Sequence, residues 1–496
     1  MVLAGKRLGR PLEGSDHIQR SGERSPIPRF KANFPKPKGM GSHVQHHQRN
    51  LIFWEEIMSI TQSLLARAEA SNPVRVGVIG AGEMGTDIVT QLSLMPGMQL
   101  AVLAEVRESA AIHAIDIAHR PRESAQVCSK LGDVEDTIRA GKTAIVTDSS
   151  FACTAEQVDV IIDATGNPGV GAELAILAME HRKHVVMMNV EADITIGAYL
   201  VEQARRAGVV YTLGAGDEPS STMEIVNFAR SLGYPIIAAG KGKNNPMKFD
   251  AVPADYEEEA ARRNMNARML VEFIDGSKTM IEMVALANAT GLVPDVPGMH
   301  GPDAGVSDLA QVLCPKEDGG ILSKSGVVDY TVGKGVAPGV FVVVKAPHER
   351  IHERLRDLKM GPGPYFTFYR PYHLTSLEVP LTAAEAVINK APLMQSLPQP
   401  VAEVATLAKR DLKPGESLGK IGEDEYRGWT LTVEDARTRN ALPLGLAERA
   451  VVTQPIKAGE LLTYANCRPD EKMKIVQLRQ LQDQMLASIE STKTGS

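Results

Sequence analysis

The hydrophobic and polar positions of this chain predict strands that alternate with helices. Short, continuously apolar runs are typical of parallel strands that are buried on both faces of a sheet. After the first run, Ile88 and Leu92 repeat at a spacing of i, i+4, which predicts a helix. The strands are predicted at 74–79, 100–104, 158–166, 184–189, 209–214 and 235–240. This alternation is typical of an α/β fold with a doubly wound parallel sheet.

A glycine-rich turn joins the first predicted strand to the first helix. It reads Gly80-Ala-Gly82-Glu83-Met84-Gly85. The first glycine permits a tight bend, the second lets the backbone approach a pyrophosphate, and the third allows close packing of helix and strand. The acidic residue Glu105 follows the second strand, where the ribose of a dinucleotide would lie. The pattern predicts a Rossmann dinucleotide-binding unit.

The residues at the end of the second strand leave the cofactor type open. A carboxylate here accepts hydrogen bonds from the ribose of NAD, whereas a nearby arginine accommodates the 2′-phosphate of NADP. This chain has both Glu105 and Arg107. We favour NADPH because of Arg107 and keep NAD as the alternative, since Arg107 is equally well interpreted as a solvated surface residue.

Two later strands end in small and polar residues, at Thr165-Gly166 and at Asn189. The carboxyl ends of parallel strands form the ligand crevice of such sheets. We therefore expect the nicotinamide half of the cofactor near Thr165, Gly166 and Asn189. The alternative is that these residues form ordinary turns between strands and helices.

Two further strands are followed by polar segments, with a helix predicted at 223–232 between them. The polar residues are Asp217, Glu218, Lys241, Lys243 and Asn244. A buried lysine exchanges a proton readily with the oxygen of a carbon that gains or loses hydride. We predict a catalytic or phosphate-holding role for Lys241 and Lys243, and a basic surface loop is the alternative.

A loop rich in glycine and proline, 291–303, follows a helix predicted at 280–290. Its polar residues Asp295, His300 and Asp303 suit metal ligation or contacts with a sugar hydroxyl. Polar residues in such loops also form turns, which is the alternative interpretation.

The segment 363–378 concentrates aromatic residues in a chain that is only 4% aromatic. Arg370, His373 and Glu378 are interleaved with them and provide an anion anchor, a titratable group and a carboxylate. We predict that the segment forms the wall of a pocket. Packing of the aromatics against a core is the alternative.

Composition limits the class of protein. With 496 residues, 43% of them apolar, the chain is long enough for about three domains. A net charge of −6 provides no general attraction for nucleic acid, and no apolar run is long enough to span a membrane, so we expect a cytoplasmic protein. The four cysteines show no paired spacing and are expected to be buried free thiols. Residues 1–57 lack hydrophobic periodicity, and we interpret them as a disordered, dispensable extension, with a natural beginning at Met58.

The tail contains one pattern twice. Residues 401–419 and 451–463 each combine an apolar strand and a short polar turn with a Gly-Glu pair and a leucine, which predicts a compact β unit. Apolar spacing over 472–490 predicts a final helix that docks on the same subunit or on a neighbour.

Together, the glycine turn, the Lys241 to Pro246 segment, the Arg-Pro-Tyr-His-Leu segment from Arg370 and the repeated tail resemble the homoserine dehydrogenase-like oxidoreductases that carry a C-terminal SAF domain. One branch of that group is similar to the reductoisomerases that convert 1-deoxy-D-xylulose 5-phosphate to 2-C-methyl-D-erythritol 4-phosphate with NADPH. The resemblance implies a Rossmann domain at 58–235, an α/β substrate domain at 236–397, an SAF module at 398–470 and a terminal helix and tail at 471–496. It also implies a homo-oligomer, expected to be a homodimer, that acts on a small molecule, a phosphorylated sugar in the reductoisomerase branch.

The resemblance implies roles for individual residues. Lys241, Lys243, His373 and Glu218 are the expected catalytic residues, and Asp217, Asn244, His300, Asp303 and Arg370 are expected to bind substrate. Lys243 and Arg370 suit a substrate phosphate. A divalent metal, Mg or Mn, would be held by Glu218 and Asp303. The alternatives are a homoserine, sugar-acid or polyol dehydrogenase or oxidoisomerase on the same scaffold, and a non-enzymatic protein that senses cofactor or binds carbohydrate.

Overall fold

The computed structural model describes residues 59–244, 247–263 and 265–494, with side chains as far as residue 491. The described residues belong to one compact unit. The prediction made for residues 1–57 lies outside the described residues. Within the described ranges, no helix is long and apolar enough to cross a membrane. All four cysteines are buried and free.

A seven-stranded parallel sheet forms the first half of the compact unit. In spatial order its strands are β3 (Ala125–Val127), β4 (Thr143–Val146), β2 (Met98–Ala104), β1 (Val74–Ile79), β5 (Val160–Asp163), β6 (His184–Met187) and β7 (Tyr211–Leu213). The order reverses at β1, which pairs with β2 on one side and with β5 on the other. The predicted doubly wound sheet is confirmed, with β3 and β4 as two strands that the sequence patterns did not predict.

Helices cover both faces of this sheet. One face carries α1 (Ile60–Glu69), α2 (Glu83–Leu94), α3 (Glu108–Ile117) and α14 (Val379–Ile388), and the other carries α4 (Leu131–Arg139), α5 (Ser150–Thr154), α6 (Pro168–Glu180) and α7 (Val190–Ala207). Strand residues alternate between these faces, so that Val160 and Ile162 pack with the first set and Ile161 with the second. Burial on both faces explains the continuous apolar runs of the sequence.

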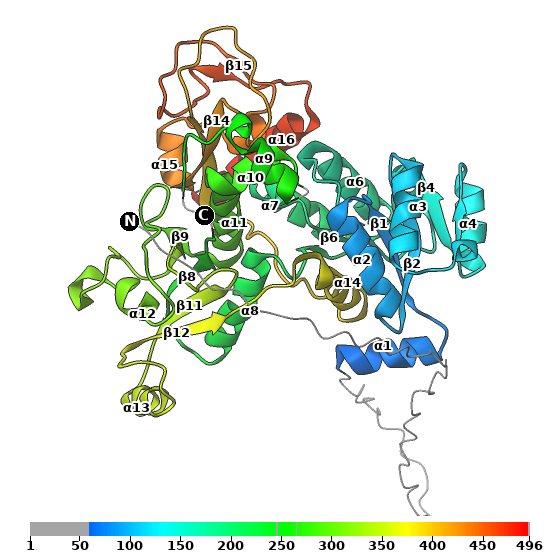
Figure 1. Ribbon diagram of the computed structural model, residues 1–496, viewed down its shortest axis with the longest axis horizontal. Helices are drawn as coiled ribbons and strands as arrows, with labels where there is room; N and C mark the ends of the chain where they lie inside the picture. The colour runs from blue at the N-terminus through cyan, green and yellow to red at the C-terminus, as the bar shows by residue number, and fades with distance from the viewer. Residues whose placement is uncertain (1–58, 245–246, 264, 495–496) are drawn as a thin grey trace, which may run out of the picture. The chain divides into compact units, whose positions relative to one another are not determined.

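Helix α14 comes from a distant part of the chain. Its residues Val379, Ala383 and Ala384 are buried in one cluster with Val186 of β6. Figure 1 shows α14 beside α2 and β6. The chain thus leaves the first sheet, builds a second one, and returns to cover the first.

The second sheet is mixed. In spatial order its strands are β12 (Tyr365–Arg370), β11 (Val340–Lys345), β8 (Ile236–Gly242), β10 (Val327–Thr331) and β9 (Val293–Pro294). Helices α8 (Glu218–Ser231) and α11 (Ser277–Thr290) pack on one face, and α12 (Leu309–Val312) packs on the other. The further helices of this part are α9 (Glu257–Arg262), α10 (Ala267–Ile274) and α13 (Glu349–Asp357). Two boundaries correct the sequence analysis: β8 continues through Lys241, and α8 begins already at Glu218.

The two copies of the tail pattern pair with each other. Leu412 and Ile456 exchange backbone hydrogen bonds of 2.8 and 3.1 Å. The glycines of the two turns, Gly415 and Gly459, have φ angles of 90° and 82°, which favour glycine. The two segments of the predicted repeat therefore lie side by side. Its regular elements are β13 (Ala402–Ala408), β14 (Tyr426–Thr432), α15 (Val433–Thr438), β15 (Val451–Val452) and β16 (Cys467–Arg468).

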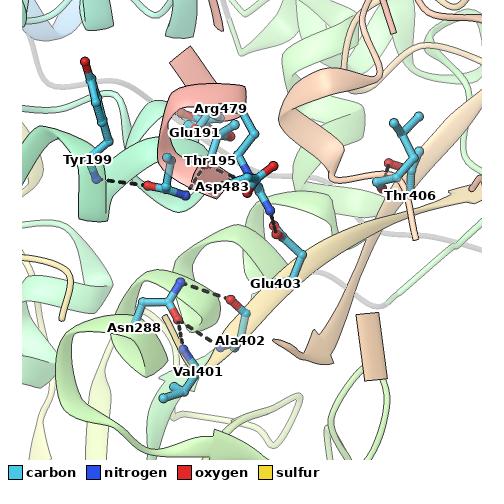
Figure 2. A network of polar contacts seen from close by, with 12 residues as sticks. Glu191, Thr195, Tyr199, Asn288, Val401, Ala402, Glu403, Thr406, Arg479 and Asp483 are labelled. Atoms are coloured by element: carbon cyan, nitrogen blue, oxygen red, sulfur yellow. Dashed lines mark hydrogen bonds and ion pairs between the residues drawn. The ribbon is translucent and has the colours of Figure 1, made fainter. Parts of the chain in front are cut away.

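The final helix, α16 (Lys474–Thr494), docks on α7 of its own chain. Helix α7 is kinked at Ile196, where φ is −138°. The amide group of Gln482 fills the kink, because it accepts a hydrogen bond from the Tyr199 N–H (3.0 Å) and donates one to the Thr195 carbonyl (3.1 Å). Figure 2 shows these contacts beside the 2.7 Å ion pair of Arg479 with Glu403 of β13. The side-chain amide thus replaces one helical hydrogen bond.

Candidate active site

The glycine turn has the geometry that its sequence predicts. Gly80 has a φ of 103°, and a Cβ atom there would lie 2.6 Å from the Ala164 carbonyl oxygen. A Cβ atom on Gly85 would overlap the Gly80 carbonyl oxygen, so this glycine is needed for helix packing. Around Gly82 there is open space, and its φ of −71° is ordinary. The turn is therefore closed by Gly80 and Gly85 and open to a ligand at Gly82, with Glu83 and Met84 opening α2.

Glu105 is tied to this turn. Its carboxylate accepts hydrogen bonds from the N–H of Ala81 (2.9 Å) and the N–H of Arg107 (3.1 Å). The Arg107 side chain is 75% exposed, with Nε 3.7 Å from Glu105. The acid thus fixes the backbone that would hold the pyrophosphate, and the exposed arginine lies beside the acid.

Thr165, Gly166 and Asn189, which we expect near the nicotinamide, lie at strand ends as predicted. None of them is among the residues that line the cavity described in the next paragraph. Asn189 caps α7 by accepting a hydrogen bond from the Ala192 N–H at 3.2 Å. Gly166 has a φ of 63°, and the Thr165 N–H bonds Asp163 at 3.2 Å. The neighbours of Asn189, Met188 and Val190, line the cavity instead.

A cavity of about 300 Å³ lies where the carboxyl ends of both sheets meet. Met84 borders it from the helix that follows the glycine turn. From the second sheet and its helices come the polar side chains of Asp217, Glu218, Ser220, Lys241, Lys243, Asn244, Lys278, Thr279 and Glu282, and His373 borders the cavity from the segment after β12. A ligand in this cavity therefore reaches both the cofactor turn and a cluster of acids and lysines.

Three carboxylates gather in the cavity. One oxygen atom from each of Asp217, Glu218 and Glu282 lies within 4.8 Å of the others, and this is the one such acidic group among the described residues. Lys241 neutralises part of the group, because its Nζ atom lies 2.6 Å from Glu218 and also contacts Glu282. All of these groups are largely buried, so their charges are weakly screened.

This crowding shifts the pKa values of the acids. Burial and the neighbouring carboxylates raise the pKa of Asp217 well above its ordinary value. Burial and Glu218 raise the pKa of Glu282 to about 7. Burial opposes ionisation of Glu218 as well, but Lys241 and its other partners hold its pKa below the ordinary value. Among the three carboxyl groups, Glu218 is therefore the one whose ionised form its surroundings favour.

Lys243 differs from Lys241 although both are buried. Its Nζ atom donates a hydrogen bond to the Phe273 carbonyl oxygen and has no carboxylate partner among the described residues. Burial and the charge of Lys241 lower the pKa of Lys243 to about 8. Lys243 thus combines access to the cavity with a pKa suited to proton transfer near neutral pH.

His373 faces the same acids. Its Nδ1 atom lies 2.8 Å from the Gly216 carbonyl oxygen, which requires a hydrogen on Nδ1. Its Nε2 atom lies 3.6 Å from Glu218. The Nε2 atom is therefore the one that is directed towards the acid cluster.

Three predicted substrate or metal residues do not join this cluster. Asp303 borders a second cavity, together with Lys243 and Asn244, so the structure does not bring it to Glu218 as a shared metal site requires. His300 bonds Asp295 at 2.8 Å and lines neither cavity. Both residues belong to the segment 291–303, which contains β9, the strand at the opposite edge of the second sheet from β12.

Arg370 is also held elsewhere. Its guanidinium group bonds Glu224 at 2.8 Å and Glu378 at 2.6 Å, and it lies over the ring of Tyr372. Two carboxylates satisfy its charge, and Arg370 lines neither cavity. The prediction that it holds a substrate phosphate does not fit these contacts.

Sequence analysis missed Lys278, Thr279 and Glu282. All three lie on α11, whose other residues are almost entirely buried and apolar or small. The available signal was a lysine and a glutamate inside an otherwise buried helix, since such residues are rarely buried without a partner or a role.

Two protein-family models match separate parts of the chain. Residues 80–213 match the model described as "Homoserine dehydrogenase, NAD binding domain". Residues 216–379 match the model described as "Oxidoreductase DRL, catalytic domain". No curated protein matches the chain in sequence.

Several solved structures are similar in fold. A probable dehydrogenase from Thermotoga maritima is 14% identical, with a TM-score of 0.37 over 64% of this chain and 90% of its own. A scyllo-inositol dehydrogenase from Lactobacillus casei with bound NAD(H) and scyllo-inositol is 14% identical, with a TM-score of 0.32 over 55% and 73%. A DOX-P reductoisomerase in complex with magnesium is 14% identical, with a TM-score of 0.31 over 42% and 56%.

The dinucleotide turn and the family matches define an NAD(P)-dependent oxidoreductase. Residues 216–379 are similar to the catalytic domain of the DRL oxidoreductases.

Proposed function

We propose that this protein is an NADPH-dependent reductoisomerase that converts 1-deoxy-D-xylulose 5-phosphate to 2-C-methyl-D-erythritol 4-phosphate. The observation that carries the proposal is the cavity at which the cofactor turn meets the acids and lysines of residues 217–282. The match of residues 216–379 to the DRL catalytic domain supports the same reaction class. We favour NADPH because the exposed Arg107 is able to reach a 2′-phosphate.

The protein's part in this reaction is to orient the substrate and move protons. The bound cofactor supplies the hydride that reduces the aldehyde formed by rearrangement of the ketose. Lys243 donates the proton that the reduced oxygen needs, since its pKa of about 8 allows it to give up and regain a proton. His373 serves as a second proton-transfer group, because its Nε2 atom faces the cavity at the side of Glu218. Asn244, which borders both cavities, is a candidate to contact the substrate hydroxyls.

The acid cluster fits a divalent cation in its ligand type. Mg²⁺ prefers carboxylate oxygens, and Asp217, Glu218 and Glu282 offer three of them within 4.8 Å. These three residues, rather than Glu218 with Asp303, would hold the ion. When bound, the ion would act as a Lewis acid towards the ketone and hydroxyl oxygens of the substrate.

A second candidate function is a metal-independent dehydrogenase of a sugar acid or polyol. One observation favours it: the Lys241 ammonium already lies between Glu218 and Glu282, where it provides positive charge without a metal ion. In that case the cluster would serve to position Lys241 at the reacting alcohol.

We infer in addition that the repeated tail, residues 398–470, is an SAF module, which the pairing of its two copies supports. A cytoplasmic homodimer remains our prediction.

One assay separates these functions. Oxidation of NADPH and NADH is measured with 1-deoxy-D-xylulose 5-phosphate, and reduction of NADP and NAD with homoserine and a polyol panel, with Mg²⁺ and with EDTA. The reductoisomerase predicts turnover of the ketose phosphate that EDTA abolishes. Turnover of a polyol that EDTA leaves intact would instead establish the dehydrogenase.

The matched variants are Glu218→Gln, which should abolish turnover, and Glu349→Gln, an exposed change at the start of α13 that should not alter it. Tight cofactor binding without turnover of any substrate would reject both enzymes and favour a sensor.

A further inference from the structure

The first turn of α11 is uncapped where it faces the main cavity. The N-cap residue is Gly276, and no side chain caps the helix. Asp275 takes the N–H of Ser277 at 2.8 Å, but no acceptor for the N–H groups of Lys278 and Thr279 is found among the described residues. Helix α11 extends over 14 residues, so its dipole adds positive potential at this end.

The hydroxyl group of Thr279 lacks a partner at the same place. Thr279 is 3% exposed and lines the cavity, yet its hydroxyl makes no hydrogen bond to any described residue. Other helical threonines donate to a carbonyl one turn back, as Thr222 does to Glu218 (2.7 Å) and Thr290 to Leu286 (2.6 Å). A buried hydroxyl without a partner is unfavourable, so this one is available for a ligand.

Lys278 adds a charge that the helix itself disfavours. A cation in the first turn opposes the helix dipole, and α11 has no acid there to offset it. The ammonium makes one ion pair, with Glu191 at 3.1 Å, and its side chain remains 19% exposed to the cavity. Two further N–H bonds of the ammonium are left for an anion.

Four acids act on the ammonium of Lys278: Glu191, Asp217, Glu282 and Glu272. Glu191 is paired with Lys278 itself, Glu282 contacts Lys241 and Glu272 contacts Arg268, so basic side chains offset three of the four.

We propose that the N-terminus of α11, with Lys278 and Thr279, binds the phosphate group of the substrate. This deepens the proposed function and rests on it for the identity of the substrate, but the anion site is defined by the residues alone. It takes over the role that the sequence suggested for Arg370, whose charge is already satisfied by two acids.

The test measures binding of inorganic phosphate to the full chain by titration calorimetry. The cofactor is kept saturating, so that phosphate does not occupy the pyrophosphate site. We expect the wild type to bind phosphate, and Lys278→Met and Thr279→Val to weaken binding about tenfold or more, the effect of losing a hydrogen bond to a charged group. Thr279→Ser retains the hydroxyl and should bind like the wild type.

Glu191→Gln separates an anion site from a merely structural ion pair. It frees Lys278, so phosphate binding should be retained or strengthened, whereas a structural pair predicts the same loss as Lys278→Met. Thr137→Val in α4 and Lys457→Met in the tail are distant controls, and unfolding curves identify any variant that is misfolded.

Two results would overturn the proposal: no phosphate binding by the wild type, or equal losses in Lys278→Met and Glu191→Gln. If 1-deoxy-D-xylulose 5-phosphate is not turned over but the variants weaken phosphate binding as expected, the proposed function fails and the anion site stands. If 1-deoxy-D-xylulose 5-phosphate is turned over, Lys278→Met and Thr279→Val should raise its KM more than they lower kcat.

Discussion

The ammonium of Lys241 lies 2.6 Å from the Glu218 carboxylate, and both groups are largely buried. Removing one partner of a buried ion pair leaves an uncompensated charge, which costs about 3 to 5 kcal/mol. We expect Lys241→Met to lower the free energy of unfolding in urea by about this amount, because Glu218 and Glu282 would lose their shared cation. The double variant Lys241→Met/Glu218→Gln should recover part of the loss.

The matched control for Lys241 is Lys457→Met, since Lys457 pairs with Asp411 on the surface. It should leave the free energy of unfolding close to the wild-type value, because surface ion pairs contribute little to stability. Equal stability of Lys241→Met and the wild type would contradict the importance of this pair. Recovery of Lys241→Met on addition of Mg²⁺ would indicate that the three carboxylates bind the ion.

The lowered pKa of Lys243 predicts a pH dependence of activity. Its folded-state pKa of about 8 lies below the ordinary lysine value, because burial and Lys241 disfavour the charged form. In the oxidising direction Lys243 must be neutral to accept a proton, so kcat/KM should rise as the pH increases through about 8 and then level off. Lys243→Gln should lose this rise together with most of the activity, and an unchanged profile in the variant would exclude Lys243 as the base.

Glu272 predicts a pH dependence of stability. Burial and Glu191 raise its pKa to about 7, so the folded chain holds a proton that the unfolded chain releases near 4.5. The protonated Glu272 carboxyl group therefore adds to the free energy of unfolding. This contribution is complete below about pH 4.5 and is lost as the pH rises to 7. The shift corresponds to about 3 kcal/mol.

In Glu272→Gln that loss between pH 4.5 and 7 should disappear from the unfolding curves. The exposed change Glu258→Gln on α9 should retain it. A variant of Glu272 that follows the wild type across this pH range would show that the carboxyl group is ionised in the folded protein.

The two glycines of the cofactor turn should respond differently to substitution. Gly85→Ala forces a Cβ atom into the Gly80 carbonyl oxygen, so it should lower the melting temperature as well as cofactor affinity. Gly82→Ala finds open space and an allowed φ, so it should fold normally and weaken only the binding of cofactor. Fluorescence titration with NADPH and a thermal melt of each variant provide the measurements, and unimpaired binding by Gly82→Ala would place the pyrophosphate away from the turn.

The hydrogen bonds of Gln482 to Tyr199 and Thr195 should stabilise the kinked helix α7. Gln482→Leu leaves the Tyr199 N–H without a partner and the Thr195 carbonyl with only the 3.3 Å bond from Arg479, at a cost of about 1 to 3 kcal/mol. Hydrogen exchange at the Tyr199 amide should accelerate, and the exposed change Gln480→Leu should leave it unaffected. Slow exchange at Tyr199 in Gln482→Leu would mean that another group fills the kink.

Sequence reasoning predicted what local patterns determine. The central strands of the first sheet are buried on both faces and therefore appear as apolar runs, and the glycine turn is recognisable because its steric demands are local. The edge strand β3 escaped prediction because Gln126 and Val127 are exposed, so that no apolar run marks it. Its neighbour β4 has only four residues.

Sequence reasoning placed Asp217, Glu218, Lys241 and Lys243 after strand ends, and these four residues line one cavity. The rest of the site was missed where residues distant in sequence decide which groups pair. In the sequence, Arg370 looks like an anion anchor. In the structure it pairs with Glu224, which lies 146 positions earlier in the chain. In the sequence, Glu282 looks like an interruption of a buried helix. In the structure it contacts Lys241.

The return of α14 to the first sheet has a consequence for how the protein can be divided. A fragment that ends at residue 235 would expose the apolar surface that Val379, Ala383 and Ala384 cover, and a fragment that covers only the matched catalytic region, 216–379, would end as that helix begins. Residues 80–213 and 216–379 are therefore not independent cassettes, because the helix that covers the first sheet begins where the second region ends. A chimaera with another cofactor domain has to transplant Val379–Ile388 together with the first sheet.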